Sequence, residues 1–77
     1  MIKDLDVVAL TRDVPEHGLV AGDIGTVVFV YDTKTPGPAY EVEFAALDGT
    51  SIAIVTLEAP SVRPIRAREI AHGRQVA

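Results

Sequence analysis

Apolar residues in this chain gather in five short runs, separated by polar segments rich in glycine and proline. The clearest run is Tyr40 to Phe44, in which apolar residues alternate strictly with Glu41 and Glu43. Because successive side chains on a strand point to opposite faces, this alternation predicts a strand with one core face and one solvated face. Similar runs predict further strands at residues 6–10, 24–31, 51–57 and 62–65.

Turn-forming residues mark the connections between these runs. The segment 22–25 reads Gly-Asp-Ile-Gly and stands directly before a β-branched run, which predicts a tight turn leading into a twisted strand. A long polar loop is expected at 11–21, a turn at 32–38, an Asp-Gly hairpin at 48–49, and a short 3₁₀ helix at 58–61. The residues expected to shape turns are Gly18, Gly22, Asp23, Gly25, Asp48 and Gly49.

Five strands, a long loop after the first and a 3₁₀ turn before the last predict an all-β fold, a small five-stranded SH3-like barrel. The barrel is expected to occupy residues 1–65 as one domain. We expect it to be closed, because open edges on so small a sheet invite association. Residues 66–77 form a basic C-terminal tail in which Arg66 to His72 have room for two helical turns ended by Gly73.

The second and fourth predicted strands are apolar on both faces. A small barrel fills its interior with one face only, so the other face needs cover. The cover could come from the tail or the long loop of the same chain, or from another protein chain. If another chain provides it, the face becomes an interface, and the expected interface residues are Val27, Phe29, Tyr31, Ala53, Val55 and Leu57.

Charge is unevenly distributed along the 77 residues, whose net charge is −4. Residues 1–58 hold ten acids and three bases, a net −7, whereas residues 59–77 hold four arginines and one glutamate, a net +3. An acidic body disfavours general nucleic-acid binding, which depends on a basic face. The tail could instead contact an acidic surface, and the expected charged contacts are Glu41, Glu43, Arg63, Arg66 and Arg68.

The residues that could carry chemistry are few. Asp13, Glu16, His17 and Asp23 form the one group that could bind a metal or transfer protons, but no ligand spacing is present, and a turn is the preferred interpretation. We therefore expect no catalytic residue, no cofactor and no metal. The lack of cysteine leaves the redox compartment open. The sequence shows no signal-peptide pattern and no apolar run long enough to cross a membrane, so a cytoplasmic location is expected.

Three blocks in order resemble a family of small bacterial proteins catalogued as a domain of unknown function: L-x-x-G-D-x-G-T-V-V from Leu19, Y-x-V-E-F from Tyr40 and T-x-x-A from Thr56. The resemblance covers roughly residues 7–65 and implies an intracellular SH3-like barrel without established enzymatic activity. A partner role of the antitoxin or immunity kind is part of that implication. The first block also resembles the KOW motif of ribosomal and transcription-elongation proteins, which implies contact with nucleic acid or the ribosome.

The sequence thus predicts a non-enzymatic SH3-like module for protein–protein interaction. Its partner is expected to be a second copy or another small bacterial protein. The alternative is a KOW-type module that binds nucleic acid or the ribosome. Nucleic-acid modules of that type are generally basic, whereas residues 1–58 of this chain are acidic.

Overall fold

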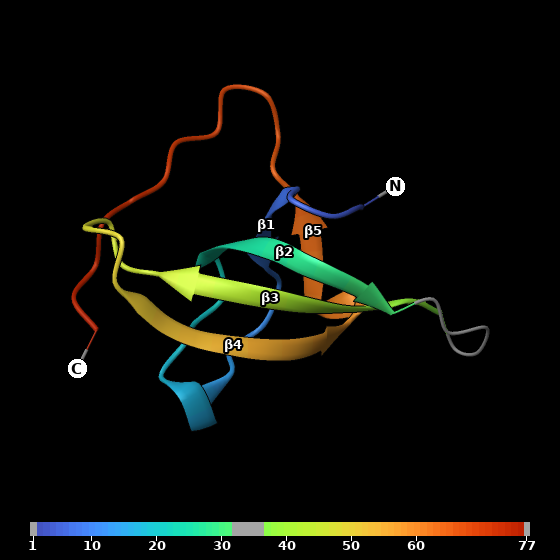
Figure 1. Ribbon diagram of the computed structural model, residues 1–77. Coiled ribbons are helices and arrows are strands. Elements are labelled where there is room, and N and C mark those ends of the chain that lie inside the picture. Colours follow the sequence, from blue (N-terminus) through green and yellow to red (C-terminus); the bar gives the residue numbers. More distant parts are fainter. Residues whose placement is uncertain (1, 32–36, 77) are drawn as a thin grey trace.

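The computed structural model describes residues 2–31 and 37–76, which form a single five-stranded antiparallel sheet (Figure 1). In chain order the elements are β1 (Val7–Leu10), η1 (Pro15–His17), β2 (Ile24–Tyr31), β3 (Ala39–Ala45), β4 (Ser51–Glu58), η2 (Ala59–Ser61) and β5 (Val62–Pro64), where η denotes a 3₁₀ helix. All five predicted strands are confirmed, and so is the 3₁₀ helix before the last of them. The turn expected at 32–38 lies outside the described residues, apart from its last two.

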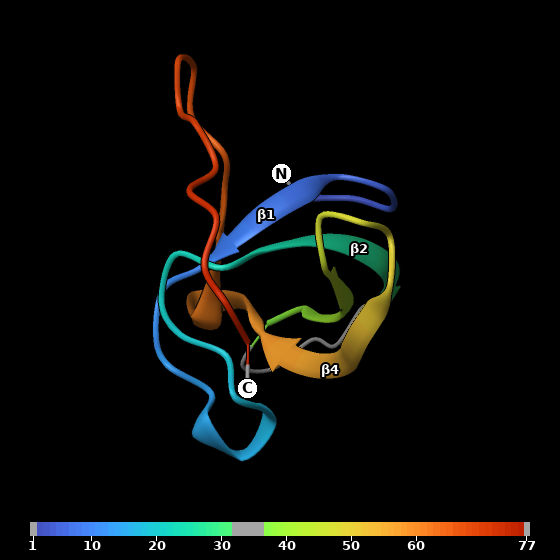
Figure 2. The same ribbon diagram turned by 90° about the vertical axis from the view of Figure 1, so that its left-hand side faces the viewer.

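The strand order is β4-β3-β2-β1-β5. Figure 2 shows these strands curling around the core, with β1 and β4 on opposite sides. The expected closed barrel is nevertheless wrong, because β4 and β5 are the two edges of the sheet and do not pair with each other. β5 has only three residues and ends at Pro64, which has no N–H group to donate. It pairs with β1 on one side and leaves its other side as an edge of the sheet.

The core is aliphatic and lies on the concave side of the sheet. β3 confirms its predicted alternation, since Tyr40, Val42 and Phe44 are buried while Glu41 and Glu43 are half-buried on the other face. The long polar loop also contributes to the core, which the sequence pattern did not indicate. The buried hydrophobic cluster comprises Val8, Leu10, Val14, Leu19, Val27, Tyr40, Val42, Phe44, Val55, Leu57 and Val62.

A β-bulge in β2 decides which of its side chains face the core. The pairing of β2 with β3 shifts between Val27 and Phe29, so that Val27 opposes Val42 and Phe29 opposes Glu41. The extra residue at Val28 reverses the alternation, because a bulge turns the following side chains to the other face. Val27 is therefore fully buried, whereas Phe29 and Tyr31 are exposed.

For four of the six residues expected to line an interface, the prediction of an outer-surface position is wrong. Val27, Val55 and Leu57 are buried in the chain's own core, and Ala53 packs against that core. In β4 the apolar residues occur on both faces, so the pattern alone could not identify the inner one. The strand's pairing settles it, because Val55 opposes the buried Val42.

The tail, residues 66–77, contains no helix over its described residues, so the helical turns expected there are not formed. It leaves β5, arches away from the body and returns along the opposite side (Figure 1). The arch reverses near Arg68, whose φ is +64°. Glu69 shapes this turn, because its carboxylate accepts hydrogen bonds from the backbone N–H of Arg66 and from the guanidinium of Arg63.

Candidate functional site

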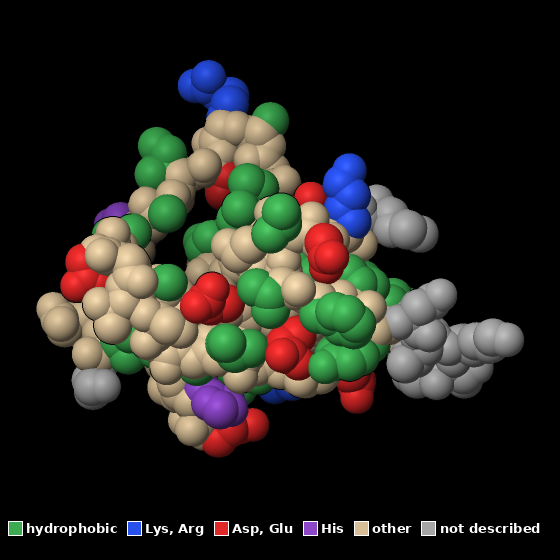
Figure 3. Space-filling model, viewed as in Figure 1, with side chains coloured by type: hydrophobic (Ala, Val, Ile, Leu, Met, Phe, Trp, Pro, Cys, Tyr) green, Lys and Arg blue, Asp and Glu red, His purple; other side chains and the backbone are tan. Residues whose placement is uncertain are grey.

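The outer face of β2, β3 and β4 carries exposed apolar side chains beside glutamates. We define this outer face as Val28, Phe29, Tyr31, Glu41, Glu43, Ile54 and Thr56. The register supports the grouping, since Glu41 opposes both Phe29 and Thr56, and directly opposed residues share a face. Figure 3 shows hydrophobic and acidic side chains intermingled over these strands. Phe29 is 51% exposed and Ile54 is 54% exposed, which is unusual for apolar residues in the middle of strands.

An aromatic pair holds one of the two glutamates on this face. The rings of Phe29 and Tyr31 pack edge to face with centroids 4.8 Å apart. The Tyr31 hydroxyl donates a hydrogen bond of 2.8 Å to Glu41 Oε1, and this bond raises the pKa of Tyr31. Glu43 has no hydrogen-bond or ion-pair partner among the described residues, so one carboxylate is available to an incoming group.

The edge strand β4 borders the outer face and is open along its length. Among the described residues β4 pairs with β3 alone, and no backbone hydrogen bond joins it to any other segment. It is eight residues long and contains no lysine or proline. Such residues usually protect an edge from pairing with another chain. The exposed Ile54 lies where this edge meets the outer face.

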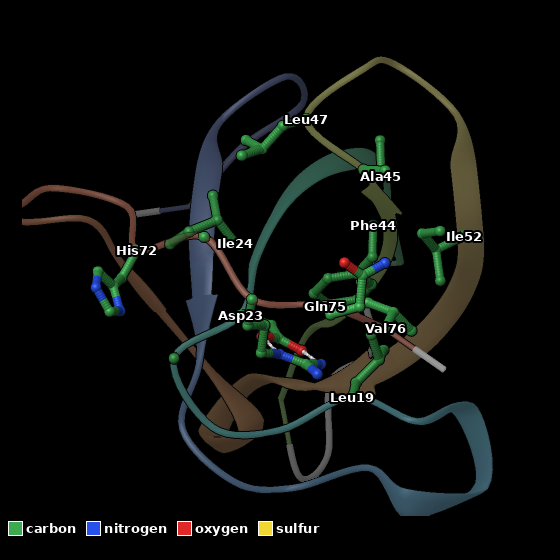
Figure 4. A pocket seen from close by; sticks show the side chains of 14 residues that line it. Leu19, Asp23, Ile24, Phe44, Ala45, Leu47, Ile52, His72, Gln75 and Val76 are labelled. Atoms are coloured by element: carbon green, nitrogen blue, oxygen red, sulfur yellow. Dashed lines mark hydrogen bonds and ion pairs between the residues drawn. The ribbon is translucent and has the colours of Figure 1, made fainter.

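A second candidate site is a cleft of about 320 Å³ between the tail and the body of the protein. Figure 3 shows the tail arching over open space, and Figure 4 shows the lining side chains from close by. The body contributes apolar side chains, among them Leu19, Ile24 and Phe44. The tail contributes Arg74 and Val76, while the His72 ring points away from the other labelled side chains (Figure 4).

An ion pair between Asp23 and Arg74 fixes the tail in this cleft. Arg74 Nε donates to Asp23 Oδ1 at 2.7 Å, and Arg74 Nη2 donates both to Asp23 Oδ2 and, at 3.0 Å, to the carbonyl of Gly18. Asp23 Oδ2 also accepts the backbone N–H of Val20 at 2.9 Å, which confirms the predicted turn role of Asp23. The Arg74 hydrogen bonds are the main reason why the pKa of Asp23 lies below its ordinary value of 3.8.

In the absence of a competing segment, we expect the tail to leave the cleft in acid. The tail-bound state lowers the pKa of Asp23, so docking is fully favourable above pH 3.8 and is lost as the pH falls through the lowered value. NMR signals of the Arg74 Nε–H group and of the Gly73 amide, followed from neutral pH into acid, should report one transition below pH 3.8. An Arg74→Ala variant should lack it, and a transition near neutral pH would contradict the assignment to Asp23.

The structure separates the residues expected to make charged contacts. Arg63, in β5, forms an ion pair with Glu69 of the tail turn and not with the glutamates of β3. Arg66 and Arg68 are exposed, and neither side chain has a hydrogen-bond or ion-pair partner among the described residues. The sequence did not identify Arg74 as a contact residue, because 51 residues separate it from Asp23 and no local pattern pairs them.

The residues with possible chemistry do not assemble into a metal site. Over residues 2–31 and 37–76, no three histidine, cysteine, aspartate or glutamate side chains are grouped so that they could hold an ion. Asp13 instead accepts the backbone N–H of Ala21 at 2.9 Å, and Asp23 binds Arg74. No helix in the described part of the chain is long and apolar enough to span a membrane.

Comparison with known proteins found one family model that matches the body of the chain. A family model described as "Domain of unknown function (DUF4926)" matches residues 4–64, which include all five strands and exclude the tail. Neither the search of curated proteins nor the search of solved structures found a match.

Proposed function

Because the chain belongs to the DUF4926 family, whose description assigns no activity, we propose its function from the free surface of its sheet. The protein acts as a non-enzymatic protein–protein interaction module that binds a second copy of itself through β4 and the outer face. The module is of the SH3-like type, which is supported by the strand order and by the 3₁₀ helix before β5. A cytoplasmic setting is part of this proposal.

The observation that carries this proposal is the contrast between the two edges of the sheet. β5 is short and contains Pro64, two features that protect an edge from further pairing. β4 is eight residues long, has neither of these two features and exposes Ile54 beside its open edge. A long open edge with exposed apolar side chains is a template for pairing with another strand.

A second copy of the chain can provide the strand that pairs with the open edge of β4. Two β4 strands that pair antiparallel are related by a two-fold axis, so one surface patch complements itself. A register centred on Ile54 places the two Ile54 side chains opposite each other and continues the outer faces of both copies. Each of the exposed apolar side chains that is buried contributes about 1.5–3 kcal/mol at most. The two Ile54 side chains and the backbone hydrogen bonds of the paired edges together support a modest dimer.

Light scattering on the purified chain tests this proposal. The wild type should show twice its 8.2 kDa mass at high protein concentration. An Ile54→Lys variant should be monomeric, because two lysines would face each other across the paired edges. Ile70→Lys is the matched control, since Ile70 is 87% exposed in the tail, and this variant should behave as the wild type does.

A wild-type mass of 8.2 kDa at every concentration would overturn self-association. A dimer that persists in the Ile54→Lys variant would move the interface away from β4. Both variants change exposed side chains, so both should fold as the wild type does. Comparison of their circular dichroism spectra with that of the wild type verifies this.

The nucleic-acid alternative receives less support from the arginines. Arg63 and Arg74 are paired with Glu69 and Asp23, which leaves Arg66 and Arg68 as the unpaired tail arginines among the described residues. Two unpaired cations beside an acidic body make a weak phosphate-binding surface.

A further inference from the structure

The cleft beneath the tail has a floor and an occupant that belong to different parts of the chain. Leu19, Asp23, Ile24 and Phe44 form the floor and lie within the family match, which ends at residue 64. The occupant, Arg74 to Val76, lies ten or more residues beyond that end. The matched domain therefore supplies one wall of the cleft, and the tail is a separate segment that lines the other.

Few contacts hold the tail in place. Residues 65–75 are all exposed, and Val76 is only half-buried. Among the described residues, Arg74 makes the polar attachments of the tail end, through its hydrogen bonds to Asp23 and to the Gly18 carbonyl. No backbone hydrogen bond joins residues 70–76 to the described body. A segment held by one side chain and one flanking apolar contact can be displaced by a similar segment.

We propose that this cleft is a binding site for an extended segment of a partner protein in which an arginine is followed, two residues later, by an aliphatic residue. The chain's own residues 74–76 occupy the site as an internal competitor. This site lies apart from the outer face and does not depend on self-association.

The chemistry of the floor specifies the arginine. Asp23 receives two parallel N–H donors from Arg74, and the Gly18 carbonyl receives a third contact, from Nη2 of the same guanidinium. A guanidinium matches this fork in a fixed plane, whereas a lysine ammonium provides only a point charge. The net −7 charge of residues 1–58 attracts a basic partner segment to the cleft.

The internal competitor has a predictable effect on affinity. A tethered segment acts at an effective concentration of roughly millimolar, so a free peptide must compete against it. Releasing the tail should therefore strengthen binding of the free peptide, because the site no longer has to be vacated first. A surface without this competition would show no such gain.

Fluorescence anisotropy with a labelled peptide of residues 70–76, Ile-Ala-His-Gly-Arg-Gln-Val, tests the proposal on the full chain. The Arg74→Ala protein should bind this peptide about tenfold or more tightly than the wild type does. Arg66→Ala is the matched control, since the side chain of this exposed tail arginine makes no hydrogen bond or ion pair with the described residues, and the affinity of this variant should equal that of the wild type.

Peptide variants keep the test independent of protein folding. A peptide with alanine in place of its arginine should not bind the Arg74→Ala protein, and a peptide with lysine there should bind at least about tenfold more weakly. Asp23→Asn should also abolish binding. Equal affinity of wild type and Arg74→Ala, or binding that ignores the peptide's arginine, would overturn the proposal. Self-association can fail in light scattering without affecting this result.

Discussion

Replacing Leu57 by alanine is expected to lower the free energy of unfolding by about 2–5 kcal/mol. Leu57 is only 2% exposed and is among the largest fully enclosed side chains of the core. Removing its isopropyl group deletes apolar contacts and leaves a cavity that an already small core can close only in part. Urea denaturation followed by circular dichroism, at one fixed protein concentration, measures the loss.

Ile54→Ala is the matched control in the same strand. Ile54 is 54% exposed on the outer face, so truncating it should change the stability of the monomer by well under about 1 kcal/mol. The comparison tests the inward orientation of alternate residues in β4. Equal losses at both positions, or a larger loss at Ile54, would contradict that orientation.

The second large effect is expected from Gly25→Ala, which should destabilise the fold by about 1–3 kcal/mol. A Cβ atom at Gly25 would lie 2.5 Å from Val42 Cγ1, 2.9 Å from Phe44 Cε1 and 3.0 Å from the Glu43 carbonyl oxygen. Val42 is fully buried and β-branched, so it has no space into which it could rotate. β2 and β3 would have to separate to accept the methyl group.

Gly73→Ala serves as the control for Gly25→Ala. Its new Cβ would meet Leu47 Cδ1 at 3.7 Å, an ordinary van der Waals contact. Thermal unfolding should therefore show a clear decrease in Tm for Gly25→Ala and almost none for Gly73→Ala. An unchanged Tm for Gly25→Ala would mean that β2 and β3 do not approach each other as closely as described.

The sequence was sufficient for elements defined by local pattern. Alternation at Tyr40 to Phe44 gave both the strand and its inner face, because only one face there is apolar. The Asp-Gly hairpin is confirmed as well, with Asp48 Oδ1 accepting the Thr50 N–H at 2.9 Å. Each of these features depends on residues within a few positions of one another.

The sequence was insufficient where distant segments decide the outcome. β2 is apolar on both faces, and the bulge at Val28 that selects the inner side chains exists only in its pairing with β3. The prediction of a closed sheet was wrong for a similar reason, since closure depends on whether β4 and β5 pair with each other. The cleft requires Asp23 and Arg74, and no local signal connects residues 51 positions apart.

The fold itself covers most of the apolar side chains that the sequence left without an assigned partner. The apolar residues expected to need an external partner, such as Val55 and Leu57, are already buried by the curvature of the sheet. What remains available is the open edge of β4 with Ile54 and, beyond β3 on the same outer face, the aromatic pair of Phe29 and Tyr31. The contact surface is therefore smaller than the sequence indicated and lies at one edge of the sheet.

Amide hydrogen exchange of β4, measured at high and at low protein concentration, tests the proposed self-association most directly. If two β4 strands pair, the amides that point away from β3 should exchange slowly at high concentration and rapidly on dilution. They should exchange rapidly at both concentrations in the Ile54→Lys variant. Rapid exchange of the same wild-type amides at every concentration would contradict an interface at the β4 edge.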